Sequence, residues 1–356
     1  MQNTRIGSDT IDVDLATGKT FVRLVSAVPT RPLLKWAGGK RQLLPALRQH
    51  YPAAFDRYVE PFLGSGAVFF DLFSAGRLNR RVARLTDSNA DLIGCYRTVR
   101  DEPDAVIAAL AALEREHRAR GNDCYYEVRD ERFNPARLRR PDPSGRYPPE
   151  LAAMFIYLNR TGFNGLFRLN RNGGFNVPAG RYADPKICDP DHVRAVARAL
   201  RTKGVTLECK AFEQALSDAR TGDFIYCDPP YAPVSKSANF AQYTADGFSE
   251  ADHGRLLAQL VVGVRRGATV LLSNSSAPVM VKAYTASPVR DAGLVMHRVP
   301  ARRAINSRAG LRGPVDELIV TNVPGTDVKQ VPIRMLRGRL RARDPHQLPA
   351  ARAGER

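Results

Sequence analysis

Two short apolar runs, each followed by a segment with helical spacing of its apolar residues, lie close together in the first third of the chain. Residues 58–62 (YVEPF) predict a buried strand and residues 65–77 a helix. Residues 81–87 (RVARLTD) predict a second strand, and residues 89–100 a second helix. Strands that alternate with helices at this spacing form a parallel sheet, because parallel neighbours need a crossover connection. The chain is therefore predicted to have an α/β fold.

The alternation of strands and helices is interrupted in the middle third of the chain. Residues 104–120 and 151–160 predict helices, which are separated by a proline-rich break at residues 139–150. A loop rich in Asn, Gly, Arg and Phe follows, and predicted strands resume at residue 205. The predicted parts are an irregular N-terminal arm (1–30), an α/β domain (31–95 and 205–324), a mostly helical insertion (96–204) and a basic C-terminal tail (325–356).

The charge balance of the chain points to a polyanionic partner. The sequence contains 54 Lys and Arg against 36 Asp and Glu, which gives a formal net charge of +18. Nucleic acid is the simplest polyanion that such a chain could bind. An arginine-rich composition that only reflects base usage in the gene is the alternative.

Cysteine usage and hydropathy argue against several classes of protein. The five cysteines form no CxxC pair and lie near no histidine cluster, which disfavours a disulfide framework or a zinc site. The longest apolar stretch, residues 256–264, is too short to cross a bilayer, and the N-terminus lacks the pattern of a signal peptide. We expect a cytoplasmic protein with no metal and no membrane contact.

One apolar run ends in a rigid polar turn. Residues 224–227 predict a buried strand that is followed directly by Asp228, Pro229, Pro230 and Tyr231. Consecutive prolines restrict the backbone, so the Asp228 carboxylate and the Pro229 carbonyl point in fixed directions. These two acceptors match the two hydrogens of a planar exocyclic amine, and Tyr231 can stack on the ring that carries it. A proline-capped turn with an incidental acid is the alternative.

Two glycines and an acid predict a nucleoside-binding edge of the sheet. Gly64 and Gly66 lie between the first predicted strand and its helix, where small residues let a cofactor approach the backbone. Asp87 ends the next strand and is placed to accept hydrogen bonds from ribose hydroxyls. A plain tight turn would also explain the glycines, and Asp87 could instead cap the following helix.

Two further segments combine basic and aromatic residues. Lys35 and Lys40 flank Trp36 and a Gly-Gly turn, a combination that suits a nucleotide or an acidic group. The loop at residues 161–182 interleaves apolar, amide and basic side chains, namely Phe163, Asn164, Leu166, Arg168, Arg171 and Arg181. Arginine can bind the guanine edge, and an apolar side chain can wedge into a base stack. The alternatives are a tryptophan that only fills the core, and lysines and arginines that are merely solvated.

In this order, the motifs resemble those of the DNA adenine-N6 methyltransferases of the Dam family, with the alpha-type order of motifs. The matching segments are KWAGGK (35–40), EPFLGSG (60–66), DSNADLI (87–93), LNRTGFNGLFRLNRNGGFNVPAGRY (158–182), YCDPPYAPVSKSANF (226–240), LLSN (271–274) and VDELIV (315–320). The resemblance implies a Rossmann-like methyltransferase sheet with a target-recognition insertion. It also implies S-adenosyl-L-methionine as the methyl donor and double-stranded DNA as the partner.

The resemblance assigns roles to individual residues. Positions that match donor contacts are Trp36, Lys40, Phe62, Gly64, Gly66, Asp87 and Asp228, and the catalytic motif is matched by Asp228, Pro229, Pro230 and Tyr231. Lys35 resembles a contact to the first guanine of the site, Phe163 an intercalating aromatic, and Asn164 a residue that steadies the gap or the DNA backbone. Leu166, Arg168 and Pro178 resemble base-reading positions, and Arg181 and Tyr182 resemble contacts to the DNA backbone.

The implied reaction is direct methyl transfer to N6 of an adenine that has been flipped out of the duplex, because the amine is unreachable in the stack. Asp228 would act mainly as an acceptor that aligns the amine. The matching residues of the insertion favour GATC as the site, and a cognate restriction endonuclease is a further candidate partner. The arginines of the tail predict non-specific phosphate contact with a steep salt dependence.

Three alternatives compete with this interpretation. An N4-cytosine methyltransferase also presents an exocyclic amine to an acceptor motif, but such enzymes more often begin that motif with Ser. RNA and protein-glutamine methyltransferases more typically begin it with Asn. A DNA-binding protein with an inactive methyltransferase fold is the third, and the intact glycine turn, Asp87 and the DPPY motif argue against it.

Overall fold

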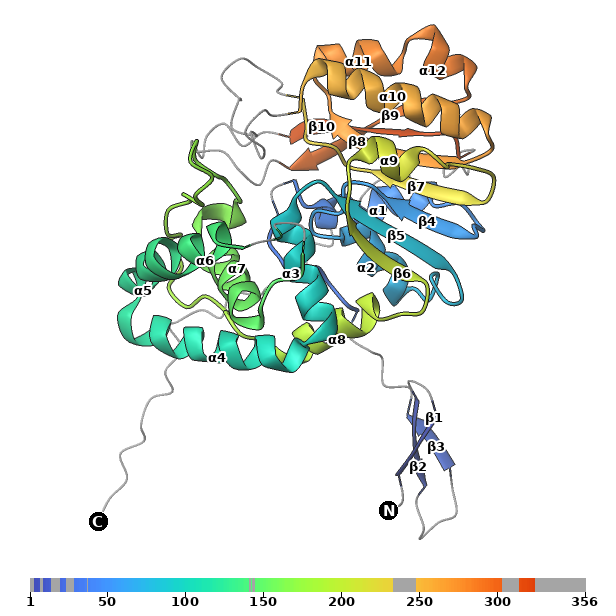
Figure 1. Cartoon of the computed structure of the whole chain (residues 1–356). Helices are drawn as coiled ribbons and strands as arrows, with labels where there is room; N and C mark the ends of the chain where they lie inside the picture. The colour runs from blue at the N-terminus through green and yellow to red at the C-terminus, as the bar shows by residue number, and fades with distance from the viewer. Residues whose placement is uncertain are drawn as a thin grey trace, which may run out of the picture. The chain divides into compact units, whose positions relative to one another are not determined.

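Figure 1 shows a computed structural model of the chain, which describes residues 3–6, 9–13, 20–23, 29–36, 38–140, 142, 145–232, 248–302 and 314–323. Its largest element is a seven-stranded sheet with the order β6-β5-β4-β7-β8-β10-β9. The strands are β4 (Arg57–Glu60), β5 (Val82–Asp87), β6 (Val205–Cys209), β7 (Asp223–Cys227), β8 (Thr269–Ser275), β9 (Val295–Arg302) and β10 (Pro314–Thr321).

The five strands from β6 to β8 are parallel, as the alternation of strands and helices predicts. From β4 the chain runs outward through β5 to β6, and it then returns to the other side of β4 to form β7. The strand order therefore reverses between β4 and β7. In open α/β sheets, ligands bind beyond the carboxyl ends of the strands at such a reversal.

The last two strands make the sheet mixed. β10 pairs antiparallel with both β8 and β9, whereas the sequence predicted a parallel sheet. The physical reason is the short connection from β9 to β10, which leaves no room for the crossover helix that a parallel pair needs. The α/β class is confirmed.

Helices cover the sheet and form the insertion (Figure 1). Those that alternate with the strands are α2 (Ala67–Ser74), α3 (Ala90–Asp101), α9 (Phe212–Leu216), α10 (Glu250–Arg265), α11 (Pro278–Tyr284) and α12 (Ser287–Asp291). The insertion contains α4 (Pro103–Arg120), α5 (Asn122–Glu127), η3 (Val128–Phe133), α6 (Asn134–Leu138), α7 (Pro149–Thr161), η4 (Phe163–Gly165) and α8 (Pro190–Leu200). Before β4 lie η1 (Lys40–Gln42), α1 (Leu44–Leu47) and η2 (Arg48–His50).

The N-terminal segment contains regular structure that the sequence did not reveal. Residues 1–30 were expected to be irregular, yet they include the antiparallel strands β1 (Asn3–Ile6), β2 (Asp9–Val13) and β3 (Thr20–Arg23). Their sequences, NTRI, DTIDV and TFVR, contain neither an apolar run of four residues nor an alternation of apolar and polar residues over the whole strand, so the pattern did not indicate them. The tail predicted at residues 325–356 lies outside the described residues.

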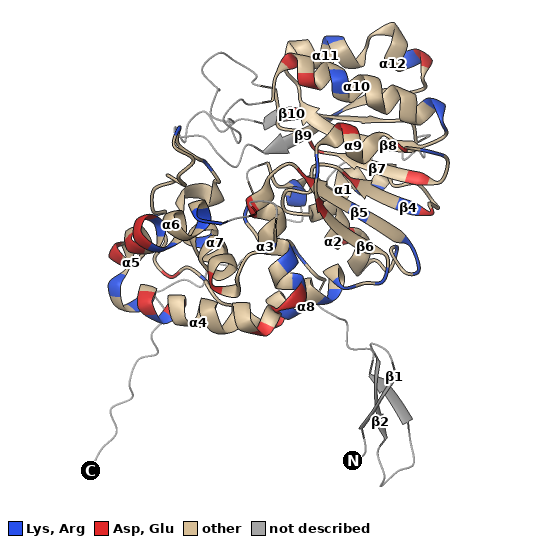
Figure 2. Cartoon of the chain, in the orientation of Figure 1, with Lys and Arg blue, Asp and Glu red and all other residues tan. Residues whose placement is uncertain are grey.

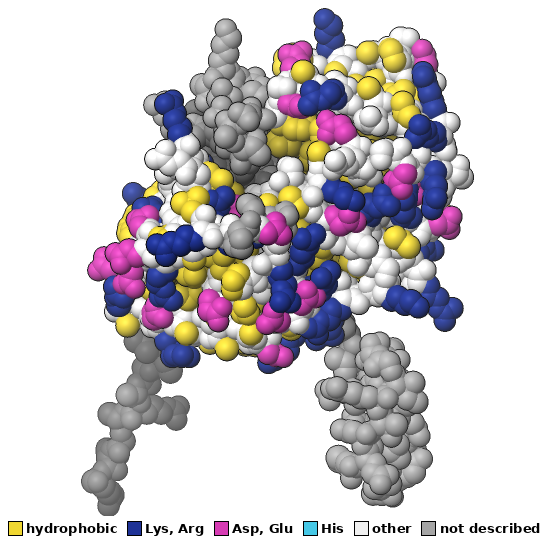
Figure 3. All heavy atoms as spheres, in the orientation of Figure 1, with side chains coloured by type: hydrophobic (Ala, Val, Ile, Leu, Met, Phe, Trp, Pro, Cys, Tyr) yellow, Lys and Arg dark blue, Asp and Glu magenta, His cyan; other side chains and the backbone are white. Residues whose placement is uncertain are grey.

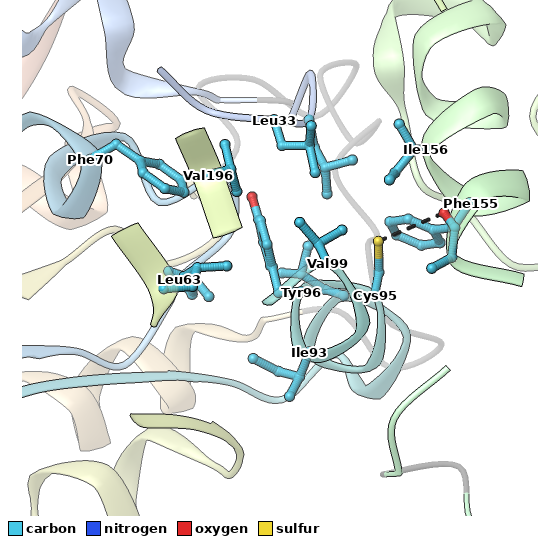
Figure 4. Close-up of a cluster of buried hydrophobic side chains, with 14 of the residues drawn as sticks. Leu33, Leu63, Phe70, Ile93, Cys95, Tyr96, Val99, Phe155, Ile156 and Val196 are labelled. Atoms are coloured by element: carbon cyan, nitrogen blue, oxygen red, sulfur yellow. Dashed lines mark hydrogen bonds between the residues drawn. The ribbon is translucent and has the colours of Figure 1, made fainter. Parts of the chain in front are cut away.

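Helix α3 connects the insertion to the sheet through a shared core (Figure 4). Its buried side chains include Ile93, Tyr96 and Val99, which lie among residues from both sides. Leu63 and Phe70 come from the sheet side, and Phe155, Ile156 and Val196 come from α7 and α8. Because one core holds both parts, the loop that follows α7 (residues 161–182, the expected recognition loop) is fixed relative to the carboxyl edge of the sheet.

Among the described residues, we find no helix whose length and apolar character would let it cross a membrane. Five free cysteines are present, three of them buried, namely Cys95, Cys124 and Cys227.

Candidate active site and DNA interface

Asp228 lies directly beyond the fully buried strand β7, at the reversal of the strand order. Its Oδ1 contacts Lys40 Nζ at 2.8 Å and accepts a hydrogen bond of 3.0 Å from Ser273 Oγ in β8. Burial raises the pKa of the Asp228 carboxyl, while the Lys40 ammonium and the Ser273 hydroxyl act to lower it. The hydroxyl of Tyr226 lies 3.1 Å from Ser273 Oγ and continues this network into the core. The carboxylate is therefore held in one orientation.

Lys40 belongs to the same group, although the sequence placed it with the donor. It is 4% exposed, and its ammonium lies 4.3 Å from the centre of the Tyr231 ring as well as against Asp228. It also donates to the Gly38 carbonyl. A lysine so close to an acid and above an aromatic face balances the buried charge of Asp228.

The glycine turn is tied to Asp87. Gly64 N donates to Asp87 Oδ2 at 3.0 Å, and Asn89 N donates to Oδ1 at 2.9 Å. Burial raises the pKa of the Asp87 carboxyl to about 6. The role of capping α3 belongs to Asn89, whose side chain accepts from the backbone of Asp91 and Leu92. The alternative in which Asp87 is the helix cap is therefore wrong, and its carboxylate keeps lone pairs for a ligand.

Close packing explains the first glycine of this turn. Gly64 has φ +48°, and a Cβ at this position would lie 3.1 Å from Cδ1 of the Trp36 ring. Trp36 is half-buried and stacks on Phe167, with 6.1 Å between ring centroids. It therefore packs against the core and also borders the turn, so both interpretations of Trp36 hold in part. Gly66 has φ +68° and precedes α2.

An aromatic cluster stands at the same edge of the sheet. Phe62 stacks on Phe212 with 5.5 Å between centroids, and it meets Phe248 edge-on at 5.7 Å. Phe212 follows β6, whose last residue, Cys209, pairs with Asp87. Sequence reasoning selected Phe62 but missed Phe212 and Phe248. An apolar residue at the start of a short helix after a strand would have been the available signal for Phe212.

The recognition loop presents most of its selected residues to solvent. Exposed side chains are Phe163, Asn164, Arg168, Arg171, Pro178, Arg181 and Tyr182, and Leu166 is half-buried. Phe163 is a large apolar side chain with 46% exposure, which is unusual for a phenylalanine. Arg168 Nε donates to Asn176 Oδ1 at 2.8 Å, so its guanidinium is oriented within the loop.

Asn159, which sequence reasoning did not select, joins this loop to Lys35. Its Oδ1 accepts from Lys35 N at 2.8 Å, and its Nδ2 donates to Lys35 O at 2.6 Å and to Gly165 O at 3.1 Å. Lys35 Nζ donates to the Arg160 carbonyl at 3.1 Å and lies 4.1 Å from the centre of the Tyr182 ring. Burial and the nearby Arg160 lower the pKa of Lys35. The structure thus brings Lys35 together with the loop, 124 residues further along the chain.

A second connection runs from the first turn of α3 to the loop. Asp91, in the first turn of α3, is paired with Arg137 of α6, with 2.7 Å between Oδ2 and Nη2. Arg137 also donates to the carbonyl of Gly173 in the loop. Asn134 holds Phe175 through its backbone N and O, at 2.8 and 3.0 Å. Helix α6 therefore holds the loop through hydrogen bonds to Gly173 and Phe175.

Charged side chains of both signs share the described surface. Helices α4 and α8 carry both signs (Figure 2), and Lys and Arg are interspersed with Asp and Glu over the face shown in Figure 3. Arg194 of α8 pairs with Asp104 of α4 at 2.9 Å. Part of the positive excess lies elsewhere, since residues 325–356 contain eight Lys or Arg and three Asp or Glu.

Comparison with known proteins identifies the family. The model of the D12 class N6 adenine-specific DNA methyltransferases matches residues 36–302. The chain belongs to this family. Its sheet is accordingly the Rossmann-like sheet of a methyltransferase that uses S-adenosyl-L-methionine, and its substrate is DNA. Membership in an adenine-specific class decides against the N4-cytosine, RNA and protein-glutamine alternatives.

Three relatives each match more than four fifths of this methyltransferase. Type II methyltransferase M1.LlaDCHI of Lactococcus lactis subsp. cremoris is 37% identical over 296 residues, covering 82% of this chain and 95% of that protein. Type II methyltransferase M.MjaIII of Methanocaldococcus jannaschii is 35% identical over 303 residues, with 82% and 99% covered. DNA adenine methylase of Escherichia coli K12 is 36% identical over 301 residues, with 83% and 96% covered. The rRNA methyltransferase aviRa from Streptomyces viridochromogenes, a solved structure, aligns with a TM-score of 0.27 and 16% identity over 83% of this chain and 87% of its own.

Proposed function

We propose that this DNA methyltransferase transfers a methyl group to N6 of the adenine in GATC, after flipping that adenine out of double-stranded DNA. The observation that carries the proposal is the arrangement of Asp228, Pro229 and Tyr231 beyond β7. The Asp228 carboxylate is fixed by Lys40 and Ser273, and the Tyr231 ring stands beside it. An acceptor pair next to an aromatic face suits a planar base with an exocyclic amine.

The donor edge fits S-adenosyl-L-methionine, which supplies an electrophilic methyl group when it is bound. Gly64 has φ +48° and a Cβ there would crowd the Trp36 ring, so glycine lets the turn and Trp36 lie close together beside Asp87. Asp87 is held by two backbone N–H groups, and its free lone pairs can accept from the two ribose hydroxyls. The flat ring of Phe62 and its aromatic neighbours offer an apolar wall for the remainder of a nucleoside.

The contacts of Lys40 support the role of Asp228 as an acceptor. The ammonium lies above Tyr231 and places an N–H donor against Asp228 Oδ1, which is the kind of position that an adenine amine needs. Both described contacts go to Oδ1, and Oδ2 can accept a hydrogen from a bound substrate. Asp228 and the Pro229 carbonyl would then hold the two amine hydrogens and direct the nitrogen lone pair at the methyl group. Loss of the proton from nitrogen follows the transfer.

The recognition loop supports a site read by both base contacts and intercalation. Phe163 is exposed and apolar, as a side chain that fills the gap left by a flipped base must be. The candidate base contacts are Lys35, Leu166, Arg168 and Pro178, and the candidate contacts to the DNA backbone are Asn164, Arg181 and Tyr182. We further propose that the recognised sequence is GATC and that the protein acts in the cytoplasm near the nucleoid. A cognate restriction endonuclease is the proposed partner.

Methylation mapping tests the proposal directly. Plasmid DNA would be prepared from cells that express the wild type or the Asp228→Ala variant. One portion would be hydrolysed to identify its modified nucleosides, and another would be sequenced to map them. We expect N6-methyladenine in GATC from the wild type and none from the variant. Methylated adenine in another sequence would refute GATC. The absence of methylation by the wild type would support the inactive-fold alternative, and equal methylation by both proteins would remove Asp228 from the mechanism.

A further inference from the structure

Tyr231 is anchored at its hydroxyl by a residue of a distant strand. Its Oη donates a hydrogen bond of 2.8 Å to Oε2 of Glu317 in β10. Glu317 is half-buried, and 86 residues separate the two positions in the chain. No role was assigned to Glu317 from the sequence, and it does not touch Asp228 or Lys40 through any hydrogen bond of the described residues.

The backbone of Tyr231 is held on both sides as well. Pro229 and Pro230 restrict the chain before it. After it, the Ala232 carbonyl accepts a hydrogen bond of 2.7 Å from Ser275 Oγ in β8. The antiparallel register of β10 and β8 places Glu317 directly across from Ser275. Two neighbouring strands therefore hold this short segment, β8 at the main chain of Ala232 and β10 at the tip of the Tyr231 ring.

A ring held at both ends keeps its plane. The hydrogen bond fixes the position of the hydroxyl oxygen and so limits rotation about Cα–Cβ. Because a phenolic O–H prefers to lie in the plane of its ring, a fixed acceptor also favours one orientation of the ring about Cβ–Cγ. Stacking on a base requires a defined plane, and a small misplacement of a reacting group lowers the rate of reaction considerably. The hydrogen bond to a charged carboxylate is among the stronger kinds.

We propose that Glu317 is a positioning residue for methyl transfer, which acts by holding the Tyr231 ring in the plane that receives the flipped adenine. This inference rests on the proposed function, in which Tyr231 stacks on the target base.

Five purified proteins test this role: the wild type, Glu317→Ala, Glu317→Gln, Tyr231→Phe and the double variant Tyr231→Phe/Glu317→Ala. Asp316→Asn is the matched control, because Asp316 is the exposed neighbour in β10 and contacts only Arg298, at 3.8 Å, among the ion pairs of the described residues. Tritiated methyl transfer to plasmid DNA gives kcat and KM for the donor. Plasmid DNA contains many different short sequences, so the assay measures methyl transfer whether or not the recognised sequence is GATC.

We expect Glu317→Ala to lower kcat by about 10-fold or more, as expected for loss of one hydrogen bond to a charged group, with the donor KM changed by less than about threefold. Glu317→Gln keeps an acceptor and should recover most of the rate, and Asp316→Asn should match the wild type. Because Glu317 acts through the Tyr231 hydroxyl, the double variant should be no slower than the slower single variant. On a duplex with 2-aminopurine as the target base, Glu317→Ala should give a smaller or less stable fluorescence increase.

Three results would overturn the inference while leaving the proposed function intact: full activity of Glu317→Ala, multiplicative losses in the double variant, or a Gln variant as slow as the Ala variant. A parallel loss of donor affinity and thermal stability would show that Glu317 is only structural. An inactive wild type would instead refute the proposed function itself.

Discussion

Replacing Gly165 by alanine should disrupt the contact between Lys35 and the recognition loop. Gly165 has φ +64°, a conformation that residues with a side chain rarely adopt. A Cβ at this position would overlap the Lys35 side chain and would lie 2.9 Å from its carbonyl oxygen. The same carbonyl already accepts the Asn159 amide at 2.6 Å. The turn cannot keep both its conformation and its distance from Lys35.

The expected destabilisation has two parts. A left-handed conformation costs an alanine about 1–2 kcal/mol, and forcing a methyl group into a packed contact costs about 1–3 kcal/mol more. Gly165→Ala should therefore lower the free energy of unfolding by about 2–5 kcal/mol, the sum of those two effects. Gly76→Ala is the matched control, because Gly76 has φ +68° but its Cβ would meet only Asn79 Nδ2, at an ordinary 3.5 Å. It should be destabilised by only about 1–2 kcal/mol, since the conformational cost alone applies.

Urea denaturation of both variants measures this difference, and methylation of duplexes with a changed first base measures its effect on recognition. We expect Gly165→Ala to lose discrimination at the base that Lys35 is proposed to contact, whereas Gly76→Ala should keep it. Equal stability losses in the two variants would refute the steric argument. Unchanged discrimination in a folded Gly165→Ala protein would show that the position of Lys35 does not matter for reading DNA.

Three further predictions concern the catalytic edge and the tail. Ser273→Ala removes a hydrogen bond that lowers the pKa of Asp228, so this pKa should rise and the acid limb of the pH–rate profile should move to higher pH, a shift that kcat measured across pH would detect. The pKa of Asp87 is raised to about 6, so its carboxylate is protonated as pH falls through that value, and affinity for the donor analogue sinefungin should then weaken. The Asp87→Asn variant should bind sinefungin weakly at every pH. Binding by this variant that still depends on pH would contradict the prediction. Deleting residues 326–356 should weaken DNA binding and reduce the slope of log affinity against log salt by about 0.9 for each phosphate that the tail neutralises, in fluorescence anisotropy titrations; an unchanged slope would exclude the tail from binding phosphates.

The local parts of this site could be predicted from the sequence. The strand that ends in Asp228 and the glycine turn at Gly64 depend on short segments, and their chemistry follows from the residues themselves. Asp87 was harder, because helix capping and ligand binding compete for an acid after a strand. Only the position of Asn89 at the first turn of α3 decided between them.

The supporting residues could not be predicted, because each one acts through a distant pairing. Ser273 reaches Asp228, and Glu317 reaches Tyr231, only because of the registers of β8 and β10. The antiparallel direction of β10 was itself not evident from the apolar pattern. In the sequence, Asn159 is only a polar residue near the end of an apolar helix. Its role is evident only from its hydrogen bonds to the backbone of Lys35. Periodicity reports which face of an element is buried and does not report its partner.

The hydrogen bonds of Asn159 to Lys35 have a consequence for how specificity could change in this family. Lys35 precedes the first strand of the sheet, while the loop that it meets lies in the insertion. The surface that we propose to face DNA is therefore assembled from two stretches of chain, and on this proposal residues 96–204 would not form an interchangeable cassette. An exchange of that segment between relatives would separate the two halves of one reading surface unless the segment around Lys35 travelled with it. Chimeras that carry both stretches should keep a defined recognition sequence, and those that carry one should lose it.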